Sequence, residues 1–490
     1  MSDLFHNFEI LGVVWLVLEW VIRIVALFVV PRNRKPSSAT AWLLVIFFFP
    51  TIGIILFLVL GSPKLPRARR NAQKTLDGFI KKTFKQFQLS RDSNALLTAK
   101  APEQYHQLSK LSEKLSHLPV FDGNRVEVLS EYDNVLKRIE ADINKAEHYI
   151  NMEYFIIVLD EKTSPIFAAL ARAVERGVIV RVMYDALSSR RYKGFKSTTQ
   201  RLKDDGVLVQ PMLPLKFGKG YVRPDLRNHR KLIAIDGTTG FTGSQNLVRR
   251  DYHRKDDIYY DELVVRVQGP IVLQLAAVFM TDWYSETGQI LDYDDFGMKP
   301  KPIERYGDSL AQVLPSGPGY EDENNLKLFT SLIHAAHKQI LIVNPYFVPD
   351  DALTTAITSA ARRGVEVTMI NSEAMDQWMV GHAQRSFYEV LLQAGVKIYW
   401  YKSPILLHSK FIIVDDNIAT IGSSNLDIRS FELDLEVTLI SYDPKVVKSL
   451  QKVAAKYLTR SKQITLKAWH QRPLSQLLMD NIARLTSALQ

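Results

Sequence analysis

Residues 150–185 read INMEYFIIVLDEKTSPIFAALARAVERGVIVRVMYD, and residues 341–371 repeat the pattern as LIVNPYFVPDDALTTAITSAARRGVEVTMIN. In each copy an apolar run containing Tyr-Phe precedes an Ala-rich segment, which is closed by Gly177 or Gly364 and followed by a β-branched run. Glycine is the preferred residue just past the end of a helix. Each copy therefore predicts a strand–helix–strand unit, in which a helix covers two parallel strands.

The two copies start about 190 residues apart, a period too long for a solenoid. We therefore predict an α/β fold of two pseudo-symmetric halves, residues 121–295 and 296–490, each a mixed sheet flanked by helices. Residues 103–117 predict a helix before the first half. The triplet Asp122-Gly123-Asn124 lies between apolar residues, which predicts a hairpin turn where the chain enters the first half.

Each half also contains the motif His-x-Lys-x4-Asp-x6-Gly-Ser-x-Asn, read as NHRKLIAIDGTTGFTGSQN at 228–246 and LHSKFIIVDDNIATIGSSN at 407–425. Six fixed positions match by chance with a frequency on the order of 10⁻⁸ per start site, so two copies at equivalent places are not accidental. The motif residues are His229, Lys231, Asp236, Gly243, Ser244 and Asn246 in the first half, and His408, Lys410, Asp415, Gly422, Ser423 and Asn425 in the second.

These residue types suit the chemistry of a phosphate diester. Alternate side chains of a strand share a face, so His229 and Lys231 point the same way, as do His408 and Lys410. If the halves face each other, the lysines and asparagines can hold the non-bridging oxygens. One histidine can attack phosphorus while the other protonates the leaving oxygen. The two lysines supply positive charge and would repel a metal ion, so we expect no metal and no other cofactor.

Two apolar stretches precede the repeat. Residues 10–30 are interrupted only by Glu19 and Arg23, one helical turn apart, and residues 39–60 carry no charge. Each is long enough to cross roughly 30 Å of hydrocarbon as a helix. We predict a transmembrane hairpin over residues 1–62, with buried core helices as the alternative. A cleaved signal peptide fits poorly, because a second span follows the first and no basic segment precedes it.

Residues 63–120 form a predicted basic helical linker. Its segment 75–87, TLDGFIKKTFKQF, has the pattern of a basic amphipathic helix, which either lies on an anionic leaflet or packs on the body. The net charge of +10 likewise indicates an anionic partner. Basic residues beside the second span outnumber those between the spans by five to three, which favours a catalytic body on the cytoplasmic side.

The paired motifs resemble the HKD motifs of the phospholipase D superfamily, and nearly the whole chain resembles the bacterial cardiolipin synthases of that superfamily. The resemblance extends to SSATAWLLVIFFFPTIGIILFLVLG, RNHRKLIAIDG, NPYFVPDD and the C-terminal AWHQRPLSQLLMDNIARL. It implies a multi-pass protein of the bacterial cell membrane. It also implies a reversible phosphatidyl transfer in which two phosphatidylglycerols give cardiolipin and glycerol through a phosphatidyl-histidine, with no nucleic acid as partner.

The resemblance also implies roles for individual residues. His229 would be the nucleophile and His408 the general acid/base, although the near-symmetry of the halves leaves an exchange of roles open. Glu262 and Glu436, which open the next apolar strands, would each orient a histidine; Asp261 is an alternative to Glu262 for His229, because the family typically has Aromatic-Arg-Asp there. The catalytic motifs would comprise His229, Lys231, Asp236, His408, Lys410 and Asp415. The phosphate would be bound by Lys231, Lys410, Asn246 and Asn425. In this family the motif aspartates usually have a structural role.

Three other functions are alternatives to this one. The membrane hairpin argues against a nuclease, although a pI near 9.3 suits nucleic acid. Two intact motifs argue against a membrane scaffold without catalysis. A hydrolytic phospholipase D, or a transferase that uses another alcohol, stays open because water and alcohols compete for the same intermediate.

Overall fold

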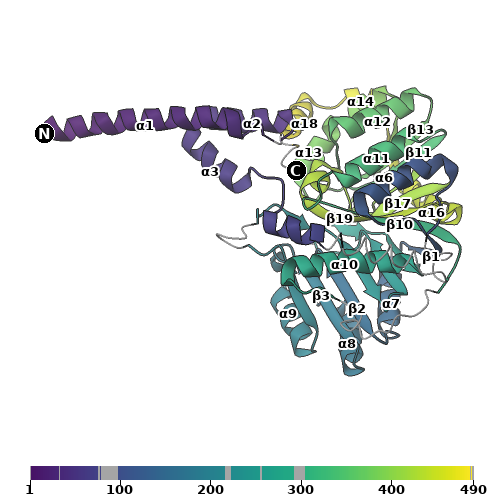
Figure 1. Cartoon of the computed structure of the whole chain (residues 1–490). Coiled ribbons are helices and arrows are strands. Elements are labelled where there is room, and N and C mark those ends of the chain that lie inside the picture. Colours follow the sequence, from purple (N-terminus) through teal and green to yellow (C-terminus); the bar gives the residue numbers. More distant parts are fainter. Residues whose placement is uncertain are drawn as a thin grey trace. The chain divides into compact units, whose positions relative to one another are not determined.

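The computed structural model describes residues 2–32, 34–75, 78, 98–215, 222–253, 257–291, 304–485 and 487, with side chains from residue 10 onward. The chain divides into two compact units, Met1–Leu65 and Pro66–Gln490 (Figure 1). The amphipathic helix predicted at residues 75–87 lies outside the described residues, apart from Thr75 and Gly78.

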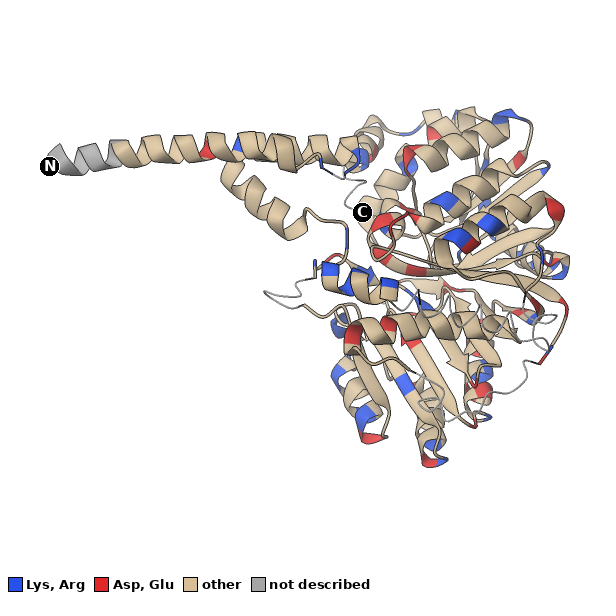
Figure 2. Cartoon of the chain, in the orientation of Figure 1, with Lys and Arg blue, Asp and Glu red and all other residues tan. Residues whose placement is uncertain are grey.

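The N-terminal unit consists of three helices, α1 (Ser2–Val29), α2 (Pro36–Phe48) and α3 (Pro50–Leu60). Residues Ile10–Val29 of α1 are long and apolar enough to cross a membrane. Glu19 and Arg23 form an ion pair of 3.3 Å, two charges in an otherwise uncharged stretch (Figure 2).

The second predicted span is not one helix. Pro50 cannot donate the backbone hydrogen bond that would continue α2, so the chain turns at Phe49 and restarts as α3. Gly53 lies so close to Ile46 that a Cβ would meet its Cα at 2.7 Å, which lets the two short helices pack together. The expected hairpin of two long helices is therefore replaced by one long and two short helices.

In the body, one continuous sheet runs through both halves. Its order is β20-β14-β13-β11-β16-β17-β19-β10-β1-β9-β7-β6-β2-β3-β4. The antiparallel pair β1 and β10 lies at the centre. Outward from it, the second half has the order β10-β19-β17-β16-β11-β13, which corresponds strand by strand to β1-β9-β7-β6-β2-β3 of the first half. The strands are β1 (Phe121–Leu129), β2 (Tyr149–Tyr154), β3 (Ile179–Asp185), β4 (Leu208–Met212), β6 (Lys231–Ile235), β7 (Thr239–Gly243), β9 (Val264–Gln268), β10 (Ser309–Ser316), β11 (Gln339–Val343), β13 (Glu366–Ser372), β14 (Lys397–Tyr401), β16 (Phe411–Val414), β17 (Ile418–Gly422), β19 (Asp434–Ser441) and β20 (Ser461–Ile464).

Helices cover this sheet on both sides. They are α6 (His106–Ser116), α7 (Tyr132–Ile143), α8 (Ser164–Glu175), α9 (Phe195–Asp204), α10 (Ile271–Thr287), α11 (Asn324–His334), α12 (Asp351–Arg362), α13 (Trp378–Ser386), α14 (Tyr388–Gln393), α15 (Ile428–Glu432), α16 (Pro444–Thr459), α17 (Leu466–His470) and α18 (Leu474–Leu485). The helix predicted over residues 103–117 is confirmed as α6 with a preceding 3-10 turn, Glu103–Tyr105.

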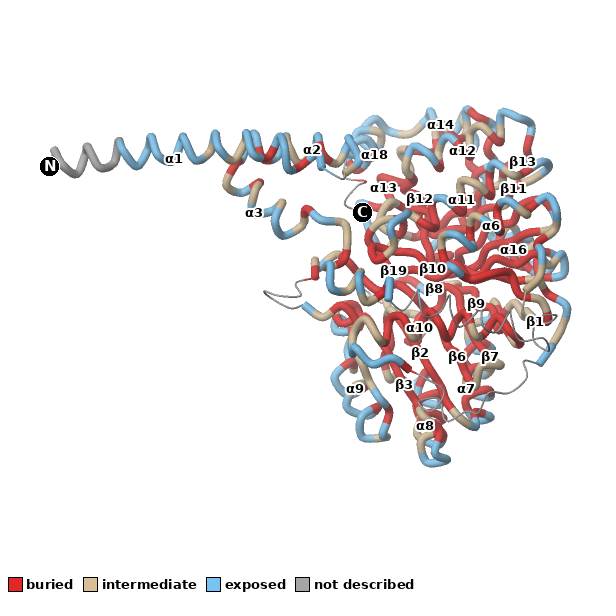
Figure 3. Tube along the Cα trace, viewed as in Figure 1, coloured by how far each residue is buried: buried red, intermediate tan, exposed pale blue. Residues whose placement is uncertain are grey.

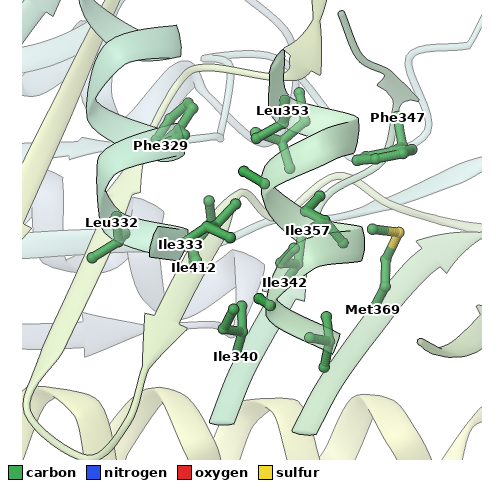
Figure 4. Close-up of a cluster of buried hydrophobic side chains, with 14 of the residues drawn as sticks. Phe329, Leu332, Ile333, Ile340, Ile342, Phe347, Leu353, Ile357, Met369 and Ile412 are labelled. Atoms are coloured by element: carbon green, nitrogen blue, oxygen red, sulfur yellow. The ribbon is translucent and has the colours of Figure 1, made fainter. Parts of the chain in front are cut away.

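Both predicted strand–helix–strand units are confirmed. Strands β2 and β3 are parallel and joined by α8, and β11 and β13 are parallel and joined by α12. The core of the second half shows why: Ile342 of β11 and Leu353 and Ile357 of α12 are fully buried together (Figure 4). Burying each such side chain contributes about 1.5–3 kcal/mol, and burial is concentrated along the sheet (Figure 3).

The hairpin turn predicted at residues 122–124 is wrong. These residues lie inside β1, where the register shifts between Phe121 and Asn124 and Gly123 has φ of 82°. The side chain of Asn124 donates to the carbonyl oxygens of Phe121 and Ser309, which closes the bulge. A glycine with positive φ serves a bulge as well as a turn, and here the bulge lets β1 pair with both β9 and β10.

Candidate active site

The two motifs meet between the halves because each one is docked on a strand of the opposite half. β5 (Arg227–Asn228) pairs in parallel with β19, and the N–H of His229 then donates to the carbonyl oxygen of Leu435 at 2.9 Å. In the same way β15 (Ile405–Leu407) pairs with β8 (Tyr259–Asp261), and the N–H of His408 donates to Asp261 at 2.7 Å. His229 and His408 are therefore both buried at the junction of the halves.

Each histidine is bonded to a glutamate of the other half. Nδ1 of His229 lies 2.9 Å from Oε1 of Glu436, and Nδ1 of His408 lies 2.9 Å from Oε2 of Glu262. The expectation that each glutamate orients the histidine of its own half is wrong, because the crossed strand pairing places each histidine beside the other half's carboxylate. Asp261 does not take that place either: it accepts hydrogen bonds from Arg250 and Tyr401.

The glutamates are fixed by the serines of the Gly-Ser pairs. Ser244 donates to Glu262 at 2.5 Å, and Ser423 donates to Glu436, which also accepts from Ser430 at 3.0 Å. The adjoining glycines permit this approach, since a Cβ at Gly243 would lie 2.3 Å from the carbonyl oxygen of Leu263.

The carboxylates determine the state of the imidazoles. His408 and Lys410 lower the pKa of Glu262 although burial opposes them, and His229 and Lys231 act likewise on Glu436. An ionised carboxylate can only accept, so the Nδ1 atoms carry the protons and each Nε2 keeps its lone pair. Burial lowers the pKa of His229 to about 4 and also lowers that of His408, so both rings are neutral near pH 7.

Two lysines make the site electrophilic. Nζ of Lys231 donates to the carbonyl oxygen of His229 at 2.7 Å, and Nζ of Lys410 donates to that of His408 at 2.8 Å. Burial lowers the pKa of Lys231 to about 7 and that of Lys410 to about 8, and for Lys231 the charge of Lys410 adds to the effect. An anion placed between the two ammonium groups would relieve this destabilisation, so the site favours a negatively charged ligand.

The asparagines of the motifs flank the same region. Nδ2 of Asn246 donates to the hydroxyl of Tyr252 at 3.2 Å, and its Oδ1 accepts from the N–H of Ile156 at 3.3 Å. Oδ1 of Asn425 is buried and has no hydrogen-bond partner among the described residues.

The motif aspartates lie at the other end of the strands. Asp236 accepts hydrogen bonds from the N–H groups of residues 147–149, and Asp415 accepts from those of residues 337–339. Both have φ of 50°, the left-handed conformation that aspartate tolerates better than most residues. Asp236 and Asp415 therefore fix the loops that enter β2 and β11, and the structure does not bring them to the histidines.

Several aromatic residues around the histidines were not assigned from the sequence. The ring of Phe155 meets that of His229 edge-on, with 4.7 Å between the ring centroids. The rings of Tyr260 and Tyr346 lie edge-on to His408, with centroid distances of 5.6 and 6.2 Å. Both tyrosine hydroxyls donate to Asp376, at 3.2 and 2.7 Å. The repeated Tyr-Phe pair is the sequence signal for Phe155 and Tyr346. By itself this pair indicates the repeat and does not indicate contact with the histidines.

Arg230 is a second residue that sequence reasoning missed. Its guanidinium is fully buried, pairs with Asp282, and donates to the carbonyl oxygen of Glu436 at 3.0 Å. The equivalent residue of the second motif is Ser409, which bonds to Tyr457. At this position the two motifs are therefore held by different side-chain contacts.

Comparisons with known proteins agree with this architecture. A family model described as "Cardiolipin synthase, PLD-like domain" matches residues 139–283 and 329–458, and one described as phospholipase D-nuclease N-terminal matches residues 21–62. The crystal structure of phosphatidylserine synthase from Haemophilus influenzae Rd KW20 has the same fold, with a TM-score of 0.57 and 16% identity over 78% of this chain and 98% of that chain.

Full-length relatives are closer in sequence. Cardiolipin synthase from Alkalihalophilus pseudofirmus is 34% identical over 94% of this chain and 90% of its own length. Cardiolipin synthase A from Wigglesworthia glossinidia brevipalpis is 31% identical over the whole of both chains. With two domain matches and relatives that align from end to end, the chain belongs to the cardiolipin synthase family of proteins with paired phospholipase D-like domains.

Proposed function

We propose that the protein is a cardiolipin synthase, a phospholipase D-type phosphatidyltransferase that converts two phosphatidylglycerols into cardiolipin and glycerol. The observation that carries the proposal is the buried pair His229 and His408, each with a lysine of its own motif and a carboxylate of the other half. The curated relatives named cardiolipin synthase support the choice of phospholipid as substrate.

In the first step, Nε2 of His229 attacks the phosphorus of one phosphatidylglycerol. The bond between phosphorus and the glycerol headgroup oxygen breaks, and His408 gives that oxygen a proton. His408 must be protonated for this step, although burial lowers its pKa. The bound phosphodiester supplies the negative charge that favours the imidazolium.

In the second step, a headgroup hydroxyl of another phosphatidylglycerol attacks the phosphatidyl-histidine. His408 takes the hydroxyl proton, a new phosphorus–oxygen bond forms, and the bond to Nε2 of His229 breaks. Cardiolipin leaves and both histidines return to their starting states, so the cycle consumes and produces no net proton. Because the same bonds form and break in reverse, glycerol can also cleave cardiolipin.

The remaining motif residues act on the phosphate in both steps. Lys231 and Lys410 hold the non-bridging oxygens, and the asparagine amides add neutral donors. Removing one such preorganised donor typically costs a factor of about 10²–10³ in rate. Glu262 and Glu436 keep the histidines in the correct tautomer and stabilise each imidazolium as it forms.

We also propose that the protein is a multi-pass protein of the bacterial cell membrane, with residues 1–62 as its membrane segment and the body in the cytoplasm. The apolar part of α1 and the match of residues 21–62 to a phospholipase D-nuclease N-terminal family support the membrane segment. Protease added to sealed spheroplasts should leave the body intact. Rapid cleavage within residues 64–120 from outside would reverse this orientation.

Purified protein in detergent, supplied with phosphatidylglycerol labelled in its glycerol headgroup, tests the reaction directly. Release of labelled glycerol with formation of labelled cardiolipin is the expected outcome. Release of glycerol with phosphatidic acid as the only lipid product would instead make the protein a hydrolytic phospholipase D. Transfer only to another added alcohol would change the assigned acceptor while keeping the chemistry.

A further inference from the structure

An exposed apolar stripe runs along the C-terminal helix α18. Leu474, Leu478, Ile482 and Leu485 are 77%, 62%, 54% and 86% exposed, and at 100° per residue they fall within an arc of about 80°. The opposite side of the helix faces the body, because Asp480 and Ala483 on that side are buried. The stripe is therefore directed outward, away from the packing that holds the helix.

Polar contacts fix α18 in this orientation. Asp480 lies 2.7 Å from Nδ1 of His382 on α13 and accepts from Arg472 at 2.6 Å. Turning the helix would separate the buried carboxylate of Asp480 from these partners and leave it unpaired, which is strongly unfavourable. An outward stripe on a helix anchored in this way is a feature of the folded body.

The neighbouring helix α13 begins with a second exposed apolar pair, Trp378 and Met379, of which Trp378 is 57% exposed. Two residues earlier lies Asp376, which accepts hydrogen bonds from Tyr260 and Tyr346 beside His408. The apolar surface thus reaches, through one short loop, to the aromatic wall of the active site.

The equivalent loop of the first half carries positive charge. It follows β3, as the loop that leads to Trp378 follows β13. Its exposed cations are Arg190, Arg191 and Lys193, and Lys196 follows at the start of α9. Ser189 anchors it beside His229, because its hydroxyl donates to the carbonyl oxygen of Phe155 at 3.3 Å and accepts from Ile157 at 3.1 Å. The active site therefore lies between an apolar loop on one side and a cationic loop on the other.

We propose that the outward stripe of α18 and the start of α13 form a membrane-docking surface of the body, which inserts into the headgroup region of an anionic leaflet. Leucine, isoleucine and tryptophan on one helix face, with cations nearby, are the composition that binds membrane interfaces. Exposed Arg484 in the last turn of α18 and exposed Lys467 on the preceding helix α17 add positive charge that complements an anionic leaflet. Docking this surface would bring lipid headgroups to the loop beside His408 without extracting the acyl chains from the membrane.

The chain contains no cysteine, so a single labelled cysteine can report on this surface in the full-length protein. Leu478→Cys, carrying an environment-sensitive nitrobenzoxadiazole label, is reconstituted into vesicles of phosphatidylcholine and phosphatidylglycerol with spin-labelled phosphatidylcholine as quencher. Gln476→Cys, which is exposed in the first turn of the same helix and points away from the stripe, is the matched control. We expect strong quenching at residue 478 and several-fold weaker quenching at residue 476.

Equal quenching at both positions would overturn the proposal. So would a label at residue 478 that is shielded from water but not quenched by lipid, because a second copy or another segment of the chain would then cover the stripe. Quenching does not depend on turnover, so a negative quenching result would not count against the proposed function. Only the idea that docking delivers the lipid substrate rests on that function.

Activity provides an independent readout. The triple variant Leu474→Ser, Leu478→Ser and Ile482→Ser should lose about tenfold or more in rate on phosphatidylglycerol vesicles while keeping its rate on a dispersed short-chain phosphatidylglycerol. Unchanged activity on vesicles would contradict the proposal. Equal losses on both substrates would also contradict it, because they would assign the stripe to folding.

Discussion

His229 packs edge-on against the apolar ring of Phe155, whereas His408 lies beside two tyrosines whose hydroxyls are bonded to the carboxylate of Asp376. The motifs that carry the two histidines share the same fixed residues at the same spacing. The charge of Asp376 also raises the pKa of Lys410, against the stronger effect of burial. One additional carboxylate therefore lies on the His408 side of the site, whereas the corresponding neighbour of His229 is apolar.

This difference indicates how two equivalent histidines can take different roles. A nucleophile must be neutral when it attacks, and a general acid must be cationic when the leaving group departs. The surroundings of His229 match the first requirement and those of His408 match the second. The proposal that His229 is the nucleophile and His408 the general acid/base makes use of this difference.

The largest expected effects come from the crossed glutamates. Glu436→Gln should lower the rate of phosphatidylation of His229 by up to about 10⁴-fold, the effect of removing the carboxylate that fixes the tautomer of a catalytic histidine. Glu262→Gln acts on His408, which serves in both steps, so it should slow both of them on phosphatidylglycerol. With an activated substrate whose leaving group needs no proton, only the second step should be slowed, and the covalent intermediate should accumulate. Single-turnover kinetics distinguish the two variants. Interchanged effects would mean that each glutamate serves the histidine of its own half.

A smaller effect is expected from Asp376→Asn. Without this carboxylate the pKa of His408 in the substrate complex should fall. As the pH rises, His408 should then lose the proton needed for the first step at a lower pH than in the unmodified protein. The basic limb of the pH profile of kcat should shift to lower pH, and the rate near neutrality should decrease by about tenfold. Tyr346→Phe, which keeps the charge of Asp376, is the control and should shift the profile less.

Much of this arrangement follows from the sequence, and the rest depends on contacts between distant segments. The repeat and the motif spacing predicted both halves and the histidine–lysine pairs. The crossed glutamates were missed because β5 pairs with β19 and β15 with β8, contacts about 200 and 150 residues apart in the chain. Asp376 was missed for the same reason, since only folding brings it to Tyr260. Pro50, by contrast, was a local signal for the break between α2 and α3.

Stability should depend on pH through His229. Its pKa is about 4 in the folded protein and near 6.5 in an unfolded chain, so the unfolded chain binds more protons between these values. The free energy of unfolding should therefore fall as the pH falls from about 6.5 to about 4, by up to about 3 kcal/mol from this group. Thermal unfolding of His229→Gln in detergent should show a weaker loss over the same range. An identical loss in both proteins would contradict the burial of a neutral ring.

The smallest effect is expected from chelation. Because Lys231 and Lys410 supply the positive charge, excess EDTA should leave turnover on detergent-dispersed lipid within about twofold of its starting value. Loss of activity that one divalent ion restores would assign the electrophile to a metal. Stimulation by added cations alone would not, because cations also screen anionic lipid surfaces.

The site of the covalent bond tests the central claim most directly. His408→Ala, given an activated phosphatidyl substrate whose leaving group needs no proton, is quenched rapidly and digested, and the modified peptide is identified by mass spectrometry. The account predicts a persistent adduct on His229, because the variant lacks the base for the second step, and no adduct in His229→Ala. An adduct on His408 in the His229→Ala protein, and none on His229 in any variant, would contradict it.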